Sequence, residues 1–416
     1  MKHLKRFILW STISILFFWT SLGVAGEIII GYSGPISGFA AEYGQDIFNG
    51  IDMAVKEINE EGGITVAGKK YTFKLEKLDD RADPTQATNN ARRFQAAGAI
   101  AVFNGVFTTT VPIMKINEEK GKEFLMMAYT STPKVEALGN KLTIISTPTF
   151  SVYVEVFTDW ALKKGWKTCA MVVTFGGYGD EWSQAFRESW EKKGGVITMS
   201  KPANYYMETD FSAPLTAAIA TKPDCMLIGG PSATTALVIE QARQMGFKGG
   251  FIMIDQAKQD IIAKLLGSTK IMGDLIGTGG VLSLPASPYA ERPFDSRYTK
   301  AYKRMTTWEC VLNYTAVHSL ARAITAAGTA TDAYKIRAAF PKAYPMLADK
   351  FPSEFMGITA GGRVKIYGTV QTITKGVSDP SFLSCWWPKS QAEFDVILKM
   401  SKVNEKVNKI LVPVPY

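Results

Sequence analysis

Histidine is almost absent from the sequence, and this argues against acid–base catalysis. The 416 residues include two histidines: His3 lies in a basic N-terminal segment, and His318 lies beside Val317 and Leu320 in an apolar helical pattern. A hydrolase of the Ser-His-Asp type needs a base, and no G-x-S-x-G, G-x-x-x-x-G-K-[ST] or H-E-x-x-H motif occurs. The apolar surroundings of His318 favour a structural role. We therefore expect a protein that is not an enzyme.

Cysteine is scarce as well, which argues against a metal centre. The four cysteines are Cys169, Cys225, Cys310 and Cys385, and no two of them form a C-x-x-C pair. With so few histidines, we expect neither a zinc site nor another metal or cofactor. Cys169 and Cys225 each open an apolar, strand-like run, which predicts buried thiols. The sequence does not decide which cysteines, if any, form disulfides.

Long apolar stretches are missing outside the N-terminus. Three basic residues within the first six precede an apolar run from Phe7 to Thr20, and small residues follow from Ser21 to Gly26. This order is typical of a secretory signal peptide, which we place at residues 1–26. An uncleaved membrane anchor is disfavoured because the run is short for a span. No later run reaches about 18 apolar residues, so we expect a soluble mature chain in the periplasm.

Dense runs of basic residues are also missing. The formal net charge is +9, and removal of Lys2, Lys5 and Arg6 with the signal peptide leaves +6. The positive charges are spread along the chain and are not interleaved with aromatic residues. Nucleic-acid binding needs a concentrated basic surface, so we expect no nucleic-acid partner.

The chain opens with a strand–loop–helix unit. Ile28–Ile30 form a continuous apolar run, residues 31–38 are rich in Gly, Ser and Pro, and apolar residues recur at helical spacing from about Tyr43. In an α/β fold such a loop lies at the carboxyl edge of a parallel sheet, where these folds bind ligands. We interpret this loop as one lip of a ligand cleft.

The same alternation of strands and helices continues in two series, with a break near Pro148. Alternation of this kind predicts parallel sheets covered by helices on both faces. Several of the strands end in Ser, Thr or acidic residues, which predicts polar groups gathered at one edge. The expected strands are Tyr71–Leu78, Ala99–Phe103, Phe124–Ala128, Cys169–Thr174, Val196–Ser200, Cys225–Ile228, Phe251–Ile254 and Ile276–Leu282.

Taken together, these segments resemble a known family. The matching stretches are GPISGFAAEYG, LDDRADPTQATNNARRF, YTSTPKV, the Tyr178-Gly179 corner and IGGPSATTALVIEQARQMGF. The chain resembles the periplasmic solute-binding proteins of branched-chain amino-acid-type ABC transporters, the type I or "Venus flytrap" class, over nearly all of residues 27–375. Residues after about 376 form a tail that is longer than is usual in the family.

The resemblance implies an α/β fold of two doubly wound parallel-sheet lobes joined by a three-segment hinge. The expected N-terminal lobe comprises residues 27–148 and 282–355. The C-terminal lobe comprises residues 149–281 and 356–416, including the tail. A monomer is expected.

The resemblance also implies which positions contact the ligand. In such proteins an aromatic residue of the first loop faces the ligand side chain, hydroxyls and backbone N–H groups at two strand ends hold its carboxylate, and the second lobe adds a tyrosine and an acid that pairs with its ammonium. Asp255 fits the position of the acid, and Gln256 is the alternative if the alignment shifts by one residue. The implied positions are Tyr43, Thr108, Thr109, Tyr129, Ser131, Tyr178 and Asp255.

The implied function is capture of a small amino acid or related carboxylate and its delivery to a membrane permease. The alternative is a sensor or regulator of the same fold that recognises an amide, urea or aromatic acid. Two features suggest a reshaped pocket: residues 231–233 carry no aromatic side chain, and Tyr129 stands where small residues are frequent. Leucine or isoleucine is therefore not assumed as the ligand.

Overall fold

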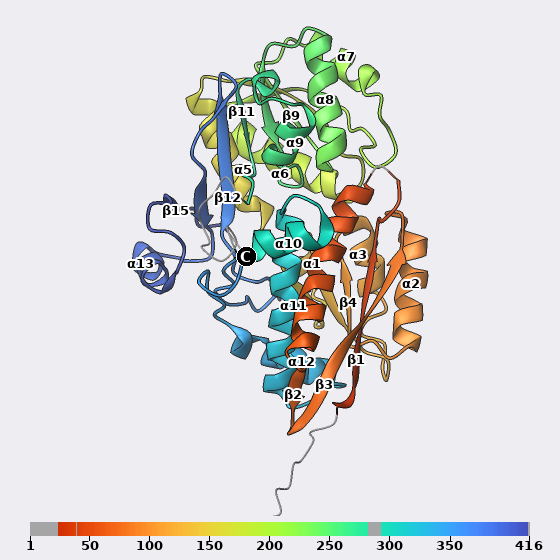
Figure 1. Ribbon diagram of the computed structural model, residues 1–416. Coiled ribbons are helices and arrows are strands. Elements are labelled where there is room, and N and C mark those ends of the chain that lie inside the picture. Colours follow the sequence, from red (N-terminus) through yellow and green to blue (C-terminus); the bar gives the residue numbers. More distant parts are fainter. Residues whose placement is uncertain (1–23, 39, 282–292, 415–416) are drawn as a thin grey trace, which may run out of the picture.

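The chain folds around two β-sheets, each covered by helices, as the computed structural model shows (Figure 1). The structure describes residues 24–38, 40–281 and 293–414. The predicted signal peptide lies largely outside these residues, and strand β1 begins at Val24. No helix in these described ranges is long and apolar enough to cross a membrane.

The first sheet forms the core of the N-terminal lobe. Its strand order is β2-β3-β1-β4-β5-β6; β2 is antiparallel to β3, and the other neighbours are parallel. The central strand β1 buries Ile28 and Ile30, as its continuous apolar run predicts. The strands are β1 (Val24–Gly34), β2 (Ile64–Val66), β3 (Lys69–Asp79), β4 (Ala101–Asn104), β5 (Leu125–Ala128) and β6 (Thr143–Ile145).

Helices from two distant parts of the sequence cover this sheet. α1 and α11 lie side by side (Figure 1) and approach closely at Gly50, where a Cβ atom would lie 2.2 Å from the Cys310 carbonyl oxygen. A side chain at position 50 would therefore force the two helices apart. The helices of this lobe are α1 (Ala41–Glu60), α2 (Pro84–Ala96), α3 (Phe107–Met114), α4 (Lys134–Ala137), α10 (Asp295–Tyr302), α11 (Trp308–Ala327), α12 (Ala333–Ala339) and the 3₁₀ turn Phe340–Ala343.

The second sheet forms the core of the C-terminal lobe, with strand order β15-β14-β12-β11-β10-β9-β7-β8 and β13 paired to β12. Its strands are β7 (Thr168–Val173), β8 (Val196–Ser200), β9 (Cys225–Gly229), β10 (Gly250–Met253), β11 (Leu275–Gly277), β12 (Gly368–Thr374), β13 (Val377–Ser378), β14 (Phe382–Cys385) and β15 (Lys409–Leu411). The helices are α5 (Phe150–Lys163), α6 (Gly177–Lys192), α7 (Ser212–Ala220), α8 (Ser232–Gln244), α9 (Gln259–Leu265), α13 (Gln391–Met400) and the 3₁₀ turn Lys270–Met272.

The predicted strands are confirmed to within a few residues, except the last. β8 has the predicted bounds, whereas β11 ends at Gly277 instead of Leu282; residues 282–292 lie outside the described part of the chain. Helix α5 was not predicted, because Val152, Val154 and Val156 recur at every second position, a spacing that favours a strand. Cys169 and Cys225 are buried, as predicted, and all four cysteines are free thiols.

The C-terminal tail belongs to the second lobe as an integral part of its sheet. β14 and β15 extend the sheet beyond β12, and Trp386 is fully buried with its indole N–H donating to the Ile366 carbonyl at 2.7 Å. The carboxylate of Glu354 accepts hydrogen bonds from the Ser401 hydroxyl (2.7 Å) and the Lys402 backbone N–H (2.6 Å). The tail is thus held by sheet pairing, by buried tryptophan and by a buried carboxylate.

Arg363 connects the segments that run between the two sheets. Its side chain is fully buried, and its Nε donates to the Glu136 carboxylate at 2.7 Å. A short bridge also pairs Arg363 with Ile145 at the end of β6. The guanidinium nitrogens donate to the backbone carbonyls of Thr130, Thr132, Thr147 and Pro148. The positions of the domain boundaries stay a prediction.

Replacing Arg363 by Met should lower the free energy of unfolding by about 3–5 kcal/mol, the usual cost of breaking a buried ion pair. The change removes the cationic partner of Glu136, which among the described residues keeps only the Thr359 hydroxyl as a donor, and leaves four buried carbonyls without the guanidinium. Urea unfolding followed by circular dichroism measures the loss. Lys335→Met removes an exposed ion pair of the same lobe and should leave the stability unchanged. Equal stabilities of the parent and Arg363→Met would contradict the assignment.

His318 should make the protein less stable in acid. It packs against Tyr314 and Phe351, and burial lowers its pKa to about 4. Since the unfolded pKa is about 6.5, the neutral ring stabilises the fold above that pH, and the stabilisation is lost as the pH falls toward 4, by about 3 kcal/mol in total. Unfolding curves from pH 7 to pH 4 should show this loss relative to His318→Phe. Parallel pH profiles of the two proteins would argue against it.

Candidate ligand-binding cleft

A cavity lies between the two lobes, with about 630 Å³ of space that includes part of the adjoining solvent. It is bounded by strand ends of both sheets and by the segments that connect the lobes. The N-terminal lobe supplies Tyr43, Gly105, Val106, Phe107, Tyr129, Thr130, Ser131, Trp308 and Leu312. The C-terminal lobe and the connecting segments supply Thr147, Pro148, Tyr153, Tyr178, Tyr206, Asp255, Gln256, Lys258, Thr278, Ile366, Tyr367 and Thr369.

Asn104 builds the wall of the N-terminal lobe at the end of β4. Its amide N–H₂ donates to the Ser33 carbonyl (2.8 Å) and the Asp80 carboxylate (3.1 Å), and its oxygen accepts from the Val106 backbone N–H (3.1 Å). Burial raises the pKa of Asp80 to about 6. This network fixes residues 105–107, which line the cavity and start α3. Asp83 caps helix α2, since its side chain accepts from the Gln86 backbone N–H.

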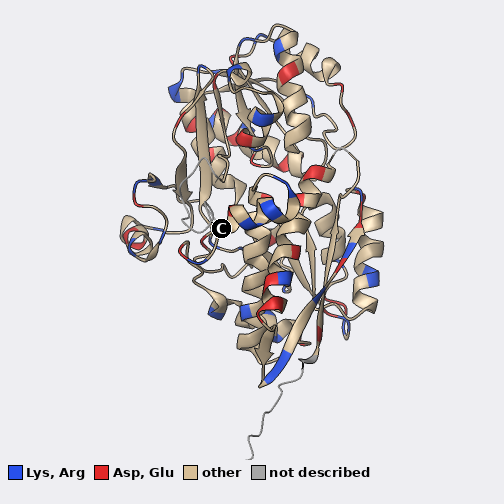
Figure 2. Ribbon diagram, viewed as in Figure 1, with Lys and Arg blue, Asp and Glu red and all other residues tan. Residues whose placement is uncertain are grey.

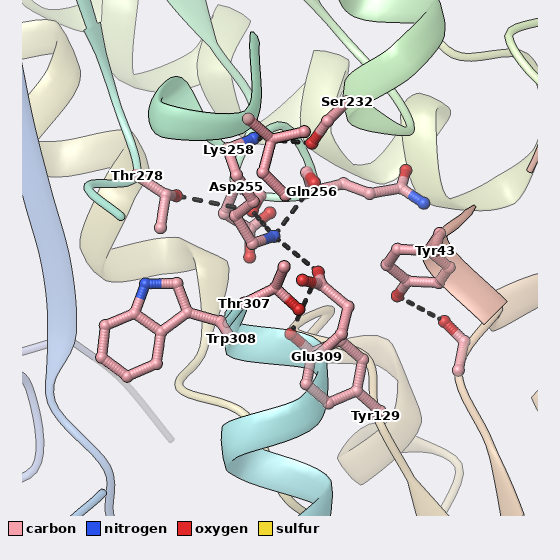
Figure 3. Close-up of polar contacts among 12 residues, drawn as sticks. Tyr43, Tyr129, Ser232, Asp255, Gln256, Lys258, Thr278, Thr307, Trp308 and Glu309 are labelled. Carbon is pink, nitrogen blue, oxygen red and sulfur yellow. Dashed lines mark hydrogen bonds and ion pairs between the residues drawn. The ribbon is translucent and has the colours of Figure 1, made fainter. Parts of the chain in front are cut away.

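Tyr43 contributes its ring to the cavity and uses its hydroxyl elsewhere. The hydroxyl donates to the Gly105 carbonyl at 2.8 Å, and the ring centroid lies 6.1 Å from that of Tyr129. The Tyr129 hydroxyl in turn donates to the Glu309 carboxylate at 3.3 Å. These two tyrosines therefore present an aromatic surface to the cavity, with their polar ends tied to the protein (Figure 3).

Thr108 and Thr109 do not line the cavity, unlike the other five implied positions. The Thr109 hydroxyl is fully buried and donates to Asn104 Oδ1 at 2.9 Å and the Val106 carbonyl at 3.0 Å. The hydroxyl has a single proton, which these two acceptors share, so it is committed to the protein. Thr108 lies close to Gly176 of the other lobe. The first turn of α3 has no side-chain cap, so no capping side chain accepts from its backbone N–H groups.

Ser131, Tyr178 and Asp255 form a hydrogen-bonded chain across the cleft. Ser131 Oγ lies 2.8 Å from the Tyr178 hydroxyl, which donates to Asp255 Oδ1. The Trp182 indole N–H donates to the same carboxylate oxygen at 2.9 Å. Burial and the nearby Asp255 raise the pKa of Tyr178, so its hydroxyl keeps its proton and acts as a donor. Among the described residues no group donates to Asp255 Oδ2.

Asp255 and Gln256 both line the cavity. Their positions therefore do not decide which of the two pairs with a ligand ammonium. The Gln256 side-chain N–H₂ donates to the Tyr206 hydroxyl at 2.8 Å. Its oxygen is buried and has no partner among the described residues, as is also true of the Thr130 hydroxyl. A ligand would be the natural partner of these two groups.

The sequence reasoning missed an ion pair at the cavity between Lys258 and Glu309. Lys258 Nζ lies 3.0 Å from Glu309 Oε1, and the two side chains are only 5% and 4% exposed (Figure 3). The same ammonium donates to the carbonyls of Asp255 (2.8 Å) and Gln256 (3.0 Å). In the sequence, Glu309 is a lone acidic residue in an otherwise apolar stretch of α11. This pattern does not identify Lys258, 51 positions away, as its partner.

Aromatic side chains dominate the lining, and sequence reasoning identified only three of them. The eight aromatic residues are Tyr43, Phe107, Tyr129, Tyr153, Tyr178, Tyr206, Trp308 and Tyr367. Against these stand two charged residues in the lining, Asp255 and Lys258. No group of three or more His, Cys, Asp or Glu side chains in the described part of the chain is placed to hold a metal ion.

Comparison with known proteins identifies the family. A family model described as "Periplasmic binding protein" matches residues 27–365. The Leu/Ile/Val-binding protein BraC3 of Rhizobium johnstonii is 29% identical over 323 residues, which cover 75% of this chain and 83% of that protein. The resemblance inferred from the sequence motifs is thereby confirmed.

Solved structures show the same two-lobed α/β fold, as predicted. The substrate-binding protein LivJ of Streptococcus pneumoniae, in complex with isoleucine, superposes with a TM-score of 0.70 at 19% identity, covering 86% of this chain and 99% of LivJ. A solute-binding protein from R. palustris, in complex with benzoate, gives 0.68 at 16% identity, covering 85% and 95%. Because the family match spans most of the sequence, the chain belongs to the periplasmic binding protein family, whose members bind solutes and are not enzymes.

Proposed function

We propose that this protein captures a small amino acid or related carboxylate in the periplasm, in the cavity between its lobes, and delivers it to the membrane permease of an ABC transporter. The observation that carries the proposal is the position of Tyr43, Tyr129, Ser131, Tyr178 and Asp255. These residues come from both lobes and line one cavity. A ligand that touches both lobes stabilises their closed arrangement, which a permease can then recognise.

The two ends of such a ligand have separate places in the cavity. A carboxylate fits the corner before α3, where the helix begins without a side-chain cap and its N–H groups favour an anion. An ammonium fits beside Asp255, because no described residue donates a hydrogen bond to its Oδ2. The aromatic surface of Tyr43, Tyr129 and Trp308 suits an apolar or aromatic body between them.

A second candidate is capture of an aromatic acid, by a transporter or by a sensor of the same fold. The aromatic lining favours it, and one structural neighbour was solved with benzoate whereas another holds isoleucine. The two candidates differ in one chemical group, the ammonium of the ligand. Pairs of ligands that differ only in this group therefore separate them.

The experiment is calorimetric titration of the mature chain with leucine and 4-methylpentanoate, and with phenylalanine and 3-phenylpropanoate. Benzoate completes the series. If Asp255 binds an ammonium, each amino acid should bind more tightly than its deaminated partner. The reverse order would favour the aromatic-acid candidate. No binding of any of these acids, together with no change in melting temperature, would contradict capture of a small carboxylate.

Asp255→Ala should weaken binding of the amino acid at least tenfold, about 1.4 kcal/mol or more, because the ammonium loses its counter-charge in a closed cleft. Asp255→Asn keeps an acceptor for Tyr178 and Trp182 and so separates loss of charge from loss of structure. The control is Asp180→Ala, which removes an exposed carboxylate of α6. Equal affinities of the parent and both Asp255 variants would remove the amino-acid proposal.

A further inference from the structure

Lys258 and Glu309 form a buried ion pair between the two lobes. Lys258 belongs to the loop that joins β10 to α9 in the C-terminal lobe, and Glu309 lies in the first turn of α11 in the N-terminal lobe. Among the ion pairs of the described residues it is the one in which both side chains are less than a tenth exposed. Figure 3 shows the two side chains meeting at the cavity.

Each partner is held in place by its own lobe. The Lys258 ammonium donates to the carbonyls of Asp255 and Gln256, and its backbone N–H donates to the Ser232 hydroxyl at 3.0 Å. With Glu309 as the third acceptor, all three N–H groups of the ammonium are used. Glu309 lies at the positive end of the α11 dipole, close to the N-cap Thr307, and accepts from Tyr129.

We propose that this pair is a cross-cleft latch, which forms when the lobes close, separates when they open, and stabilises the closed state with any ligand. The inference rests on the proposed function, in which the cleft closes on a captured solute. Closure removes both charged groups from water, and their mutual attraction offsets the loss of hydration. Loss of one partner would leave the other buried and unpaired, which strongly disfavours the closed state. Lys258 and Glu309 are thus positioning residues for closure.

The latch makes a prediction that a direct ligand contact does not make. If only a fraction of molecules can close, the apparent affinity falls by that fraction for every ligand alike. A residue that touches the ligand changes the ranking of ligands instead. Because Lys258 itself lines the cavity, a uniform loss of affinity identifies a latch only when closure is also lost in the absence of ligand.

The chain offers a matched control in a second ion pair between the lobes. Lys134 of α4 lies 2.7 Å from Glu181 of α6, and these side chains are 51% and 32% exposed. Exposed pairs contribute little because water already stabilises both charges. Lys134→Met should therefore change affinities by less than about twofold.

The variants are Lys258→Met, Glu309→Gln, the double variant Lys258→Met/Glu309→Met, and Lys134→Met, each in the full mature chain. Closure is measured without ligand through spin labels at Gln86→Cys and Met207→Cys, which lie in the two lobes and line one groove. The four native cysteines are buried and so should not react with the label. Affinities for phenylalanine, 3-phenylpropanoate and benzoate are measured by calorimetry, and circular dichroism checks folding.

Both single variants should lose the short label-to-label distance of the closed state and weaken every acid that binds by the same factor, at least tenfold. The double variant should bind more tightly than either single variant, since no unpaired charge is buried. Unchanged distances in Lys258→Met and Glu309→Gln would overturn the latch, as would a loss confined to one ligand class. If no acid binds the parent, the proposed function fails, whereas the label distances still decide whether the latch exists.

Discussion

The hydrogen bonds of the buried Arg363 guanidinium are the interaction on which the geometry of the site depends. This side chain donates to carbonyls of the loop after β5 and of the segment that leads from β6 to α5, and it pairs with Glu136 of α4. Its own backbone pairs with the end of β6. A planar cation with five donors can bring several carbonyls to one point, which no neutral side chain can do. The wall that carries Tyr129 and Ser131 is thereby joined to the segments that link the lobes.

The wall of the C-terminal lobe is built in a different way. Tyr178, Trp182 and Asp255 come from α6 and the loop after β10, and their hydrogen bonds to one another keep the carboxylate in place. Asp255 and Lys258, the charged residues of the cavity, are thus held by hydrogen bonds within this lobe, and Lys258 also pairs with Glu309 across the cleft. In the view of Figure 2, acidic and basic residues are interspersed over the surfaces of both lobes and do not gather by sign.

The predictable part of this protein is the part encoded by neighbouring residues. The apolar run of β1 and the Asp83 cap depend on local sequence, so strands and helices could be inferred from it, whereas the five cavity residues were implied by the resemblance to a known family. Thr109 was assigned to the ligand because the resemblance to a known family implied it, but its hydroxyl donates to Asn104 Oδ1, and this competing contact is visible only in three dimensions. The sheet pairing of β14 and the aromatic rings of Trp308 and Tyr367 depend on segments far apart in sequence, for which one chain gives no signal.

The two kinds of polar group in the cavity act on closure in opposite directions. The Gln256 oxygen and the Thr130 hydroxyl are buried without partners among the described residues, so an empty closed cleft leaves their hydrogen bonds unmade, at a cost of about 1–3 kcal/mol each. The Lys258–Glu309 pair, by contrast, is complete without a ligand and favours closure. A ligand that hydrogen-bonds to the Gln256 oxygen and the Thr130 hydroxyl removes this unfavourable contribution, and the Lys258–Glu309 pair continues to favour closure. Under the proposed function, a ligand whose polar atoms match Gln256 and Thr130 should therefore bind more tightly than an apolar molecule of the same size, which would leave them unpaired.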